Sequence, residues 1–216
     1  MKQSKNYLWV LIAIQVVIIV CTVWSVGAMV LWRGEGNMAI GGARAFRYFT
    51  VDSNILAAIA SAVLLPQLVK AAKAGNPQLS RGASMLYHAG ATSVAITFFT
   101  VLFFLGPTMG YAAMFVGNNF FMHGSTPVLA MVSSIILLAR ITPRLTFKQS
   151  LAGWIPVVIY GAVYISCVVF TQFWPDFYGF NRGGMWFISY PVMMLAGFGL
   201  SCGLWALQNK VRKRIL

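Results

Sequence analysis

Six long apolar stretches, separated by short polar segments, set the pattern of this chain. They run near residues 7–32, 50–69, 84–105, 120–139, 150–173 and 186–207. Each has the roughly 20 residues that an α-helix needs to cross about 30 Å of hydrocarbon. Each is also longer than a membrane β-barrel strand of roughly 10 alternating residues. The pattern therefore predicts an all-α, polytopic membrane protein with six transmembrane helices.

The composition agrees with this prediction. Of the 216 residues, 59% are hydrophobic and 9% are charged, and the mean hydropathy is +0.78, whereas an ordinary soluble domain has roughly 25% charged residues. The first apolar stretch exceeds the roughly 7 to 15 residues of a signal-peptide core, so we expect it to stay as a mature helix. The connections are too short to hold a separate soluble domain, so residues 1–216 are predicted to form one transmembrane domain.

The basic residues indicate an orientation for this domain. The net charge is +13, and twelve of the sixteen Lys and Arg residues fall on one side of the six-span arrangement, leaving Arg33, Arg44, Arg47 and Arg182 on the other. By the positive-inside rule both termini are then cytoplasmic, and we expect the plasma membrane as the location. The C-terminal "KVRKRIL" fits an orientation signal that attracts anionic lipid, so membrane lipids are the expected partners and nucleic acid is not.

The short polar stretch "YFTVDSN", residues 48–54, opens the second apolar run. At helical spacing Thr50, Ser53 and Asn54 share one face and Asp52 points elsewhere. Side chains of these types often cap a helix start, which is one explanation for the stretch. We expect Asp52 to have a structural or orienting role, either as a cap or paired with an arginine on the same side, Arg44, Arg47 or Arg182.

A second polar group lies in the fourth run, where Asn119 and His123 are four residues apart. Pro127 removes the helical hydrogen-bond partner of the His123 carbonyl, so the helix is expected to depart from regular geometry there. Thr50 is roughly 27 Å from Leu68, and His123 roughly 24 Å from Ala139, at the inner ends of their helices. The two side chains are therefore predicted at a similar depth, just inside the outer boundary.

The other histidine and the cysteines give no comparable site. His88 comes near the start of the third run, at the opposite side of the membrane from Thr50, and is expected to turn its ring tip toward the cytoplasm. Cys21, Cys167 and Cys202 all fall in apolar runs, where cysteine behaves as a small hydrophobic residue. Their spacing fits neither a disulfide framework nor a metal site, and no cofactor is expected.

A threonine within reach of a histidine base can attack an ester carbonyl, since the base accepts the hydroxyl proton and returns it to the leaving group. In that interpretation Thr50 is the nucleophile, His123 the base, and Ser53, Asn54 or Asn119 stabilise the oxyanion or line the cavity. The acyl chain is expected among apolar residues such as Phe120 and Phe121. Capping by Thr50 and interhelical hydrogen bonding by His123 would explain the same residues without catalysis.

Three segments resemble those of a known group of membrane proteins. "FRYFTVDSN" at the second run and "NNFFMHGSTPVLAM" in the fourth, with "WIPVVIYGAVYI" in the fifth, are similar to Pr6Pr-type bacterial membrane proteins. More remotely they resemble the androgen-induced (FAR-17a-like) hydrolases of fatty acid esters of hydroxy fatty acids. The resemblance implies a six-helix fold, a nucleophilic Thr50 and a partner His123. A carboxylate common in those hydrolases is absent, and Arg140 stands in its region.

The sequence thus leads to two principal hypotheses of function. The first is an integral membrane hydrolase of lipid-type, fatty acyl esters. The second is a transporter or ligand-binding protein in which Asp52, Asn54 and His123 line a polar cavity, since proton-coupled carriers use such groups. A structural or partner-binding membrane protein is a third option.

Overall fold

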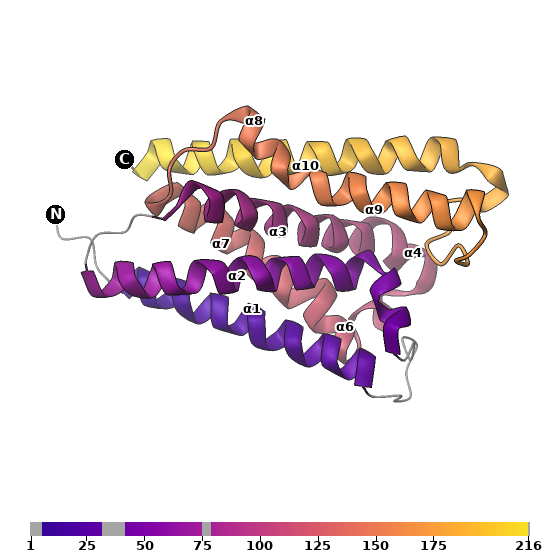
Figure 1. The fold of residues 1–216 in the computed structure, drawn as a ribbon, viewed down its shortest axis with the longest axis horizontal. Coiled ribbons are helices and arrows are strands. Elements are labelled where there is room, and N and C mark those ends of the chain that lie inside the picture. Colours follow the sequence, from indigo (N-terminus) through magenta and orange to yellow (C-terminus); the bar gives the residue numbers. More distant parts are fainter. Residues whose placement is uncertain (1–5, 32–41, 75–78, 216) are drawn as a thin grey trace.

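The described part of the chain is built from helices. The computed structural model describes residues 6–31, 42–74 and 79–215, and every regular element in these ranges is helical, as the sequence predicts (Figure 1). The α-helices are α1 (Asn6–Leu31), α2 (Phe49–Ala74), α3 (Arg81–Thr100), α4 (Gly106–Met109), α5 (Tyr111–Phe115), α6 (Asn118–Phe120), α7 (Thr126–Ile141), α8 (Phe147–Ser150), α9 (Ile155–Ile165) and α10 (Trp186–Ile215). The remaining elements are three 3₁₀ turns, η1 (Gly42–Arg47), η4 (Leu151–Gly153) and η6 (Arg182–Gly184), and three π-helical turns, η2 (Val101–Leu105), η3 (Phe121–Ser125) and η5 (Ser166–Phe170).

Four helices are long and apolar enough to cross a membrane. They are Asn6–Leu31, Phe49–Ala74, Arg81–Met109 and Trp186–Arg214, and a fifth span results if Phe147–Gly153 and Ile155–Phe170, bent by 41°, count as one. These segments coincide with five of the six predicted apolar runs. The sixth, 120–139, falls on α6, η3 and α7, and α7 itself has only 16 residues. The described residues therefore form a helical membrane protein with four or five candidate spans, and the count of six stays a prediction.

Prolines account for two of the three π-helical turns. In η2 the Gly106 amide donates to the carbonyl of Val101, and in η3 the Thr126 amide donates to that of Phe121. The next residue in each case is a proline, Pro107 or Pro127, whose ring would clash with the carbonyl four residues earlier in a regular helix. The wider turn accommodates that ring. The expected irregularity at His123 is thus a π turn with His123 at its centre.

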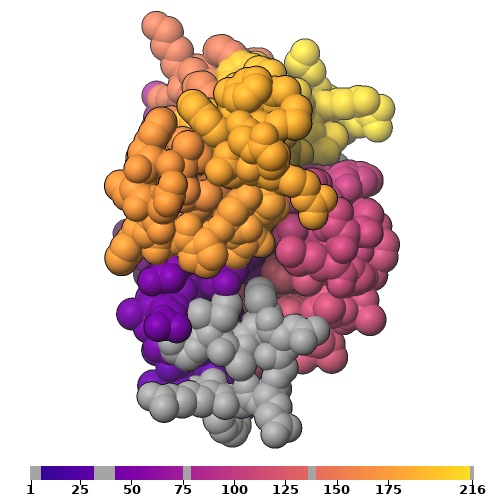
Figure 2. Space-filling model, turned by 90° about the vertical axis from the view of Figure 1, so that its right-hand side faces the viewer, coloured from indigo at the N-terminus to yellow at the C-terminus, as the bar shows by residue number. Residues whose placement is uncertain are grey.

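The two ends of the bundle differ in charge. One end, which we call the basic end, carries ten described Lys and Arg residues: Lys70, Lys73, Arg81, Arg140, Arg144, Lys148, Lys210, Arg212, Lys213 and Arg214. The other end, which we call the loop end, carries η1, α4 to α6, all three π turns and the segment 171–185. Figure 2 looks onto the loop end, where the violet start of α2, the magenta region of α4 to α6 and the orange segment before α10 meet. Lys2, Lys5, Arg33 and Glu35 lie outside the described residues.

Helices α2 and α3 pack closely because small residues face one another. A Cβ atom added to Gly90 of α3 would lie 2.9 Å from the Cα atom of Ala57 in α2. Ala57, Ala60, Ala91 and Ala95 are all buried nearby on these two helices. Small residues allow such approach between membrane helices, where packing supplies much of the association energy. The close α2–α3 contact holds the start of α2 in register with the end of α3.

We predict that Gly90→Ala destabilises the protein while Gly27→Ala does not. Both glycines lie inside helices, so alanine raises helix propensity by up to about 1 kcal/mol at either position. Only the new Cβ at position 90 meets backbone, whereas a Cβ at Gly27 has nothing within 4 Å. Overpacking of this kind costs about 1–3 kcal/mol. Thermal unfolding in detergent measures the difference, and equal stabilisation by both substitutions would contradict the close contact.

Candidate functional site

The segment 171–185 folds back against the bundle around the carboxylate of Asp176. One carboxylate oxygen, Oδ1, accepts hydrogen bonds from the Tyr164 hydroxyl at 2.7 Å and from the Phe180 amide at 2.9 Å. The other, Oδ2, accepts from the Asn181 amide at 2.8 Å. The aromatic side chains of this segment, Trp174, Phe177, Tyr178 and Phe180, pack together with residues of α2, α9 and α10. Asp176 therefore shapes the segment into a cap over the loop end.

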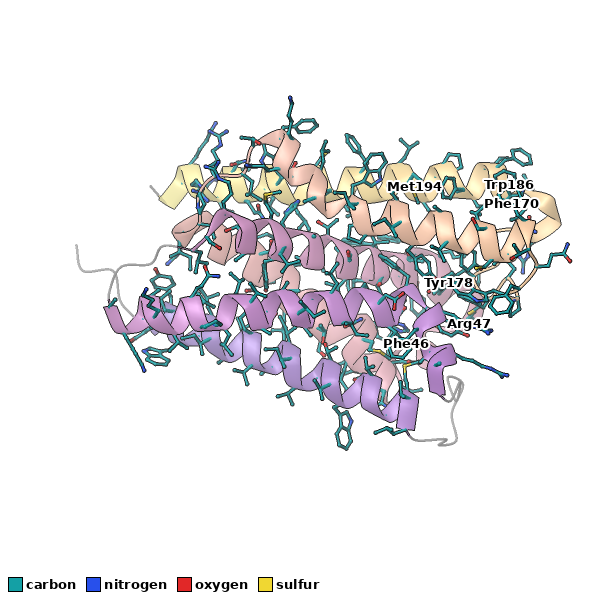
Figure 3. The ribbon with its side chains drawn as sticks, in the orientation of Figure 1. Phe46, Arg47, Phe170, Tyr178, Trp186 and Met194 are labelled. Carbon is teal, nitrogen blue, oxygen red and sulfur yellow. The ribbon has the colours of Figure 1, made fainter. Side chains whose placement is uncertain are left out.

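Tyr178 connects this cap to the start of α2. Its hydroxyl oxygen accepts a hydrogen bond from the Phe49 amide at 3.0 Å, one of the amides that a helix start leaves without a partner. Its own amide donates to the Tyr164 hydroxyl at 3.1 Å. Burial raises the pKa of Tyr178 to about 12, so the phenol stays protonated and able to donate a hydrogen bond near neutral pH. Figure 3 shows Tyr178 and Arg47 at the same end of the bundle.

Thr50 lies in the first turn of α2 and is buried. Its side chain lines the same two hollows as Tyr178. Its backbone carbonyl accepts from the Ser53 hydroxyl at 3.1 Å and from the Asn54 side-chain amide at 2.7 Å. The side chains of Ser53 and Asn54 thus hold the backbone of Thr50, the residue that the sequence predicts as a nucleophile.

Asn54 and Ser53 help to position Thr50. Neither residue lines the cavity that Thr50 and His123 share. The Asn54 amide nitrogen also donates to the Met122 carbonyl at 3.1 Å, so its two hydrogens are directed at two carbonyl groups. This bond ties α2 to the π turn that contains His123. The Ser53 hydroxyl is 2.9 Å from the Thr97 hydroxyl of α3. Neither side chain is aimed at an ester group bound between Thr50 and His123.

His123 has a defined tautomer when neutral. Its Nδ1 atom is 2.6 Å from the carbonyl oxygen of Met114 in α5. Because a carbonyl only accepts hydrogen bonds, Nδ1 carries the proton and Nε2 has the free lone pair. The ring is 1% exposed. A backbone carbonyl thus orients the imidazole in the way that a carboxylate or carbonyl orients histidine bases and metal ligands elsewhere.

Thr50 and His123 line one cavity of about 350 Å³ at the loop end. No hydrogen bond joins these two residues directly, and both side chains line the cavity wall. Asn119 also lines it, with its side-chain amide donating to the Ala113 carbonyl at 3.0 Å. The wall is completed by Tyr48, Leu105, Met109, Ala113, Met114, Phe177 and Tyr178. Thr50, Asn119 and His123, from two distant segments, are therefore brought to the same cavity.

Of the two roles expected for Asp52, a helix cap or a partner for an arginine, the arginine pairing is wrong. Asp52 lies in the first turn of α2, where its charge suits the helix dipole, but it forms no ion pair with the described Arg44, Arg47 or Arg182. Its side chain lines a separate cavity of about 410 Å³ between α2 and α9. The guanidinium of Arg47 instead lies over the rings of Phe173 and Trp174, at 5.6 and 5.9 Å from their centroids.

The ring tip of His88 does not face outward as expected. The side chain is fully buried, because α8, η4 and α10 cover this part of α3. Its Nε2 atom is 3.2 Å from the Ser201 hydroxyl, which donates to the Ser150 carbonyl at 2.6 Å. His88 is thus an internal hydrogen-bonding residue. In the part of the chain that the structure describes, no group of three His, Cys, Asp or Glu side chains could hold a metal ion.

Comparison with known proteins leaves the chain without an assigned relative: no protein-family model, curated protein or solved structure matches it. The site is therefore interpreted from its own geometry.

Sequence reasoning missed the residues that hold Thr50 and His123 in place. The carbonyl of Met114 has no side-chain signature. Tyr178 and Asp176 belong to "WPDFYGF", residues 174–180, where one acidic residue stands among four aromatic residues in a predicted connection. That aromatic density in a short connection is a signal for a buried segment.

We predict that Asp176→Ala loosens the cap. The substitution removes the acceptor of three hydrogen bonds and leaves the proton of the Tyr164 hydroxyl without its acceptor, at a cost of about 1–3 kcal/mol. Hydrogen exchange across 171–185 should speed up and the melting temperature should fall. Ser189→Ala, which removes an exposed hydroxyl at 3.4 Å from a carbonyl, is the matched control and should leave both unchanged. Unchanged exchange in Asp176→Ala would show that aromatic packing alone holds the cap.

Proposed function

We propose that this protein is a multi-pass hydrolase of fatty acyl esters in the plasma membrane, with Thr50 as nucleophile and His123 as general base. The observation that carries the proposal is the shared cavity of Thr50 and His123. The Met114 carbonyl fixes the histidine tautomer that leaves Nε2 free to accept a proton. The proposal agrees with the resemblance of the two motifs to Pr6Pr-type and androgen-induced membrane proteins, to which we propose a relationship.

The reaction proceeds through an acyl-enzyme. The Thr50 oxygen attacks the ester carbonyl carbon while His123 Nε2 accepts the hydroxyl proton. The tetrahedral intermediate collapses, the bond to the alcohol oxygen breaks, and the imidazolium gives its proton to that oxygen. Water then attacks the acyl-threonine with His123 again as base, which releases the carboxylic acid and restores the Thr50 hydroxyl.

Tyr178 and Asn119 are the proposed oxyanion donors in place of Ser53 and Asn54. Tyr178 is protonated near neutral pH and lines the cavity together with Thr50. Asn119 has a second amide hydrogen beyond the one that it donates to Ala113, and it lines the same cavity. Hydrogen-bond donors held beside the reacting carbonyl stabilise the developing negative charge.

One observation favours the transporter alternative. Several buried polar atoms of the core have no hydrogen-bond partner among the described residues, including the Ser61 hydroxyl, the Thr92 hydroxyl and His88 Nδ1. A carrier would use such groups as a hydrated path from the outer cavity inward. In that case Thr50 and His123 bind a ligand separately and perform no covalent chemistry.

The double mutant separates these functions. In a catalytic dyad, the two single variants and the double variant should show the same low level of fluorophosphonate labelling and ester hydrolysis. The single variants are Thr50→Ala and His123→Ala, and the losses are equal because residues that act as a unit are strongly non-additive. Thr50→Ser keeps a hydroxyl and should retain part of the activity. Melting temperatures in detergent check that each variant folds. Additive losses, or full labelling of Thr50→Ala, would refute the dyad and favour ligand binding.

We further propose six spans with both termini cytoplasmic, because the described basic residues gather at one end. Single cysteines placed at two exposed positions, Val116 of the loop end and Lys148 of the basic end, test this in a background in which Cys21, Cys167 and Cys202 are serine. In intact cells an impermeant thiol reagent should label Val116→Cys and spare Lys148→Cys. The opposite labelling would invert the orientation and place the site on the cytoplasmic side.

A further inference from the structure

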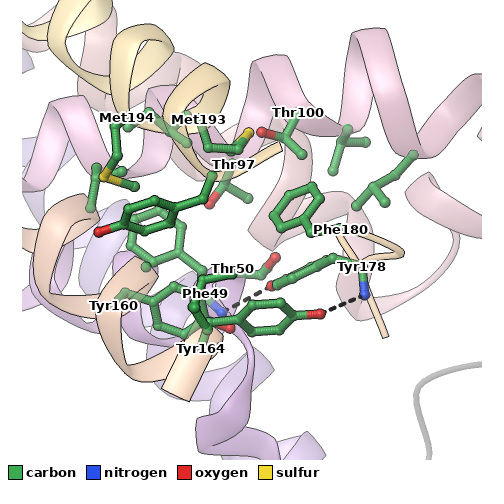
Figure 4. A pocket seen from close by; sticks show the side chains of 17 residues that line it. Phe49, Thr50, Thr97, Thr100, Tyr160, Tyr164, Tyr178, Phe180, Met193 and Met194 are labelled. Carbon is green, nitrogen blue, oxygen red and sulfur yellow. Dashed lines mark hydrogen bonds between the residues drawn. The ribbon is translucent and has the colours of Figure 1, made fainter. Parts of the chain in front are cut away.

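A second, smaller hollow lies beside Thr50 and is not lined by His123. It is lined by the start of α2, the end of α3, η2, α9 and α10, with Thr50, Tyr178 and Leu105 shared with the His123 cavity (Figure 4). We call this hollow the slot. Because Thr50 belongs to both walls, a group attacked by its hydroxyl has room to extend in two directions.

The slot is apolar although several tyrosines line it. The Tyr160 hydroxyl donates to the Arg47 carbonyl at 2.6 Å, the Tyr164 hydroxyl donates to Asp176, and the Tyr178 hydroxyl accepts from Phe49. The hydroxyls of Tyr160 and Tyr164 are engaged in these bonds, so these two residues present their rings to the slot. The other walls are mainly aliphatic, aromatic or thioether: Phe49, Ile96, Val101, Leu105, Val157, Ile165, Phe180, Met193 and Met194.

The dimensions of the slot suit an unbranched chain. Its volume of about 50 Å³ corresponds to roughly four water-sized positions, far less than the 350 Å³ of the His123 cavity. Met193 and Met194 have flexible thioether side chains, which can move to lengthen the slot for more methylene groups.

We infer that the slot binds the acyl chain of the ester substrate, with Thr50 at its mouth and the alcohol part in the His123 cavity. The inference rests on the proposed hydrolase function and adds a substrate class, esters of unbranched acyl chains. It also replaces the sequence-based expectation that the chain lies at Phe120 and Phe121. Phe120 is 52% exposed on the outside of the bundle and does not line the slot.

Gly161 of α9 offers a direct way to fill the slot. A Cβ atom at this position would lie 2.7 Å from Met194 Cε and 2.9 Å from Tyr190 Cε2, two side chains that themselves line the slot. A larger side chain at Gly161 therefore removes volume from it. Gly199 of α10 is a matched control, since it lies on the exposed side of a helix and an added Cβ there has nothing within 4 Å.

The first measurement compares hydrolysis of p-nitrophenyl acetate and p-nitrophenyl octanoate by the full chain in phosphatidylcholine nanodiscs. Gly161→Leu should lower kcat/KM for octanoate about tenfold or more and change that for acetate by less than about threefold. Gly199→Leu should leave both values unchanged. Met194→Ala should shift the preference toward longer chains, which tests the slot even if Gly161→Leu does not fold.

The second measurement needs no catalysis. In the Thr50→Ala background, N-methyloctanamide should raise the melting temperature more than N-methylacetamide, and Gly161→Leu should abolish this difference. If N-methyloctanamide raises the melting temperature more but wild type hydrolyses neither ester, the slot is supported as an acyl-chain site and the hydrolase proposal is refuted. If wild type hydrolyses octanoate and Gly161→Leu leaves its kcat/KM unchanged, the slot assignment falls and the hydrolase stands. Equal octanoate losses in Gly199→Leu would indicate a bilayer effect and overturn the assignment.

Discussion

The hydrogen bond from the Phe49 amide to the Tyr178 hydroxyl is the contact on which the loop end depends. A helix that starts near the membrane boundary has free amide groups, and an amide buried without a partner is costly. Tyr178, from a segment 129 residues later, supplies that partner and is itself held through Tyr164 and Asp176. The start of α2 and the fold of segment 171–185 therefore stabilise each other, and Thr50 lies next to their junction.

The π turns give the same end its internal space. An α-helix that contains a proline must break or widen, and η2 and η3 widen directly before Pro107 and Pro127. In η3 the Asn54 side chain binds the Met122 carbonyl, so α2 supports the irregular backbone beside His123. Non-helical backbone at membrane depth requires such partners from protein or water. The arrangement of Thr50 and His123 around one cavity follows from these local constraints.

The sequence predicts the helices well, because their apolar runs are long and the polar connections short. It also predicts that Thr50 and His123 lie at a similar depth, since depth follows from helical rise alone. It does not predict what surrounds a side chain. The arginine pairing expected of Asp52 failed because Arg47 lies over two aromatic rings, and the exposed ring tip expected of His88 failed because α8, η4 and α10 cover the ring. Contacts through backbone carbonyls, such as Met114 with His123, leave no trace in residue identity.

The carbonyl that orients His123 has a consequence for how this site can change during evolution. An orienting carboxylate is lost by one substitution, whereas any residue at position 114 supplies a carbonyl. The position of α5 is what must be maintained instead. This helix begins after Gly110 and is followed by Gly117, and these glycines have φ values of 91° and 56°. Residues with a side chain adopt such values at a cost, so these two turn glycines should tolerate less variation than Met114 itself. The selection that maintains the histidine tautomer would then act on two residues that do not line the cavity.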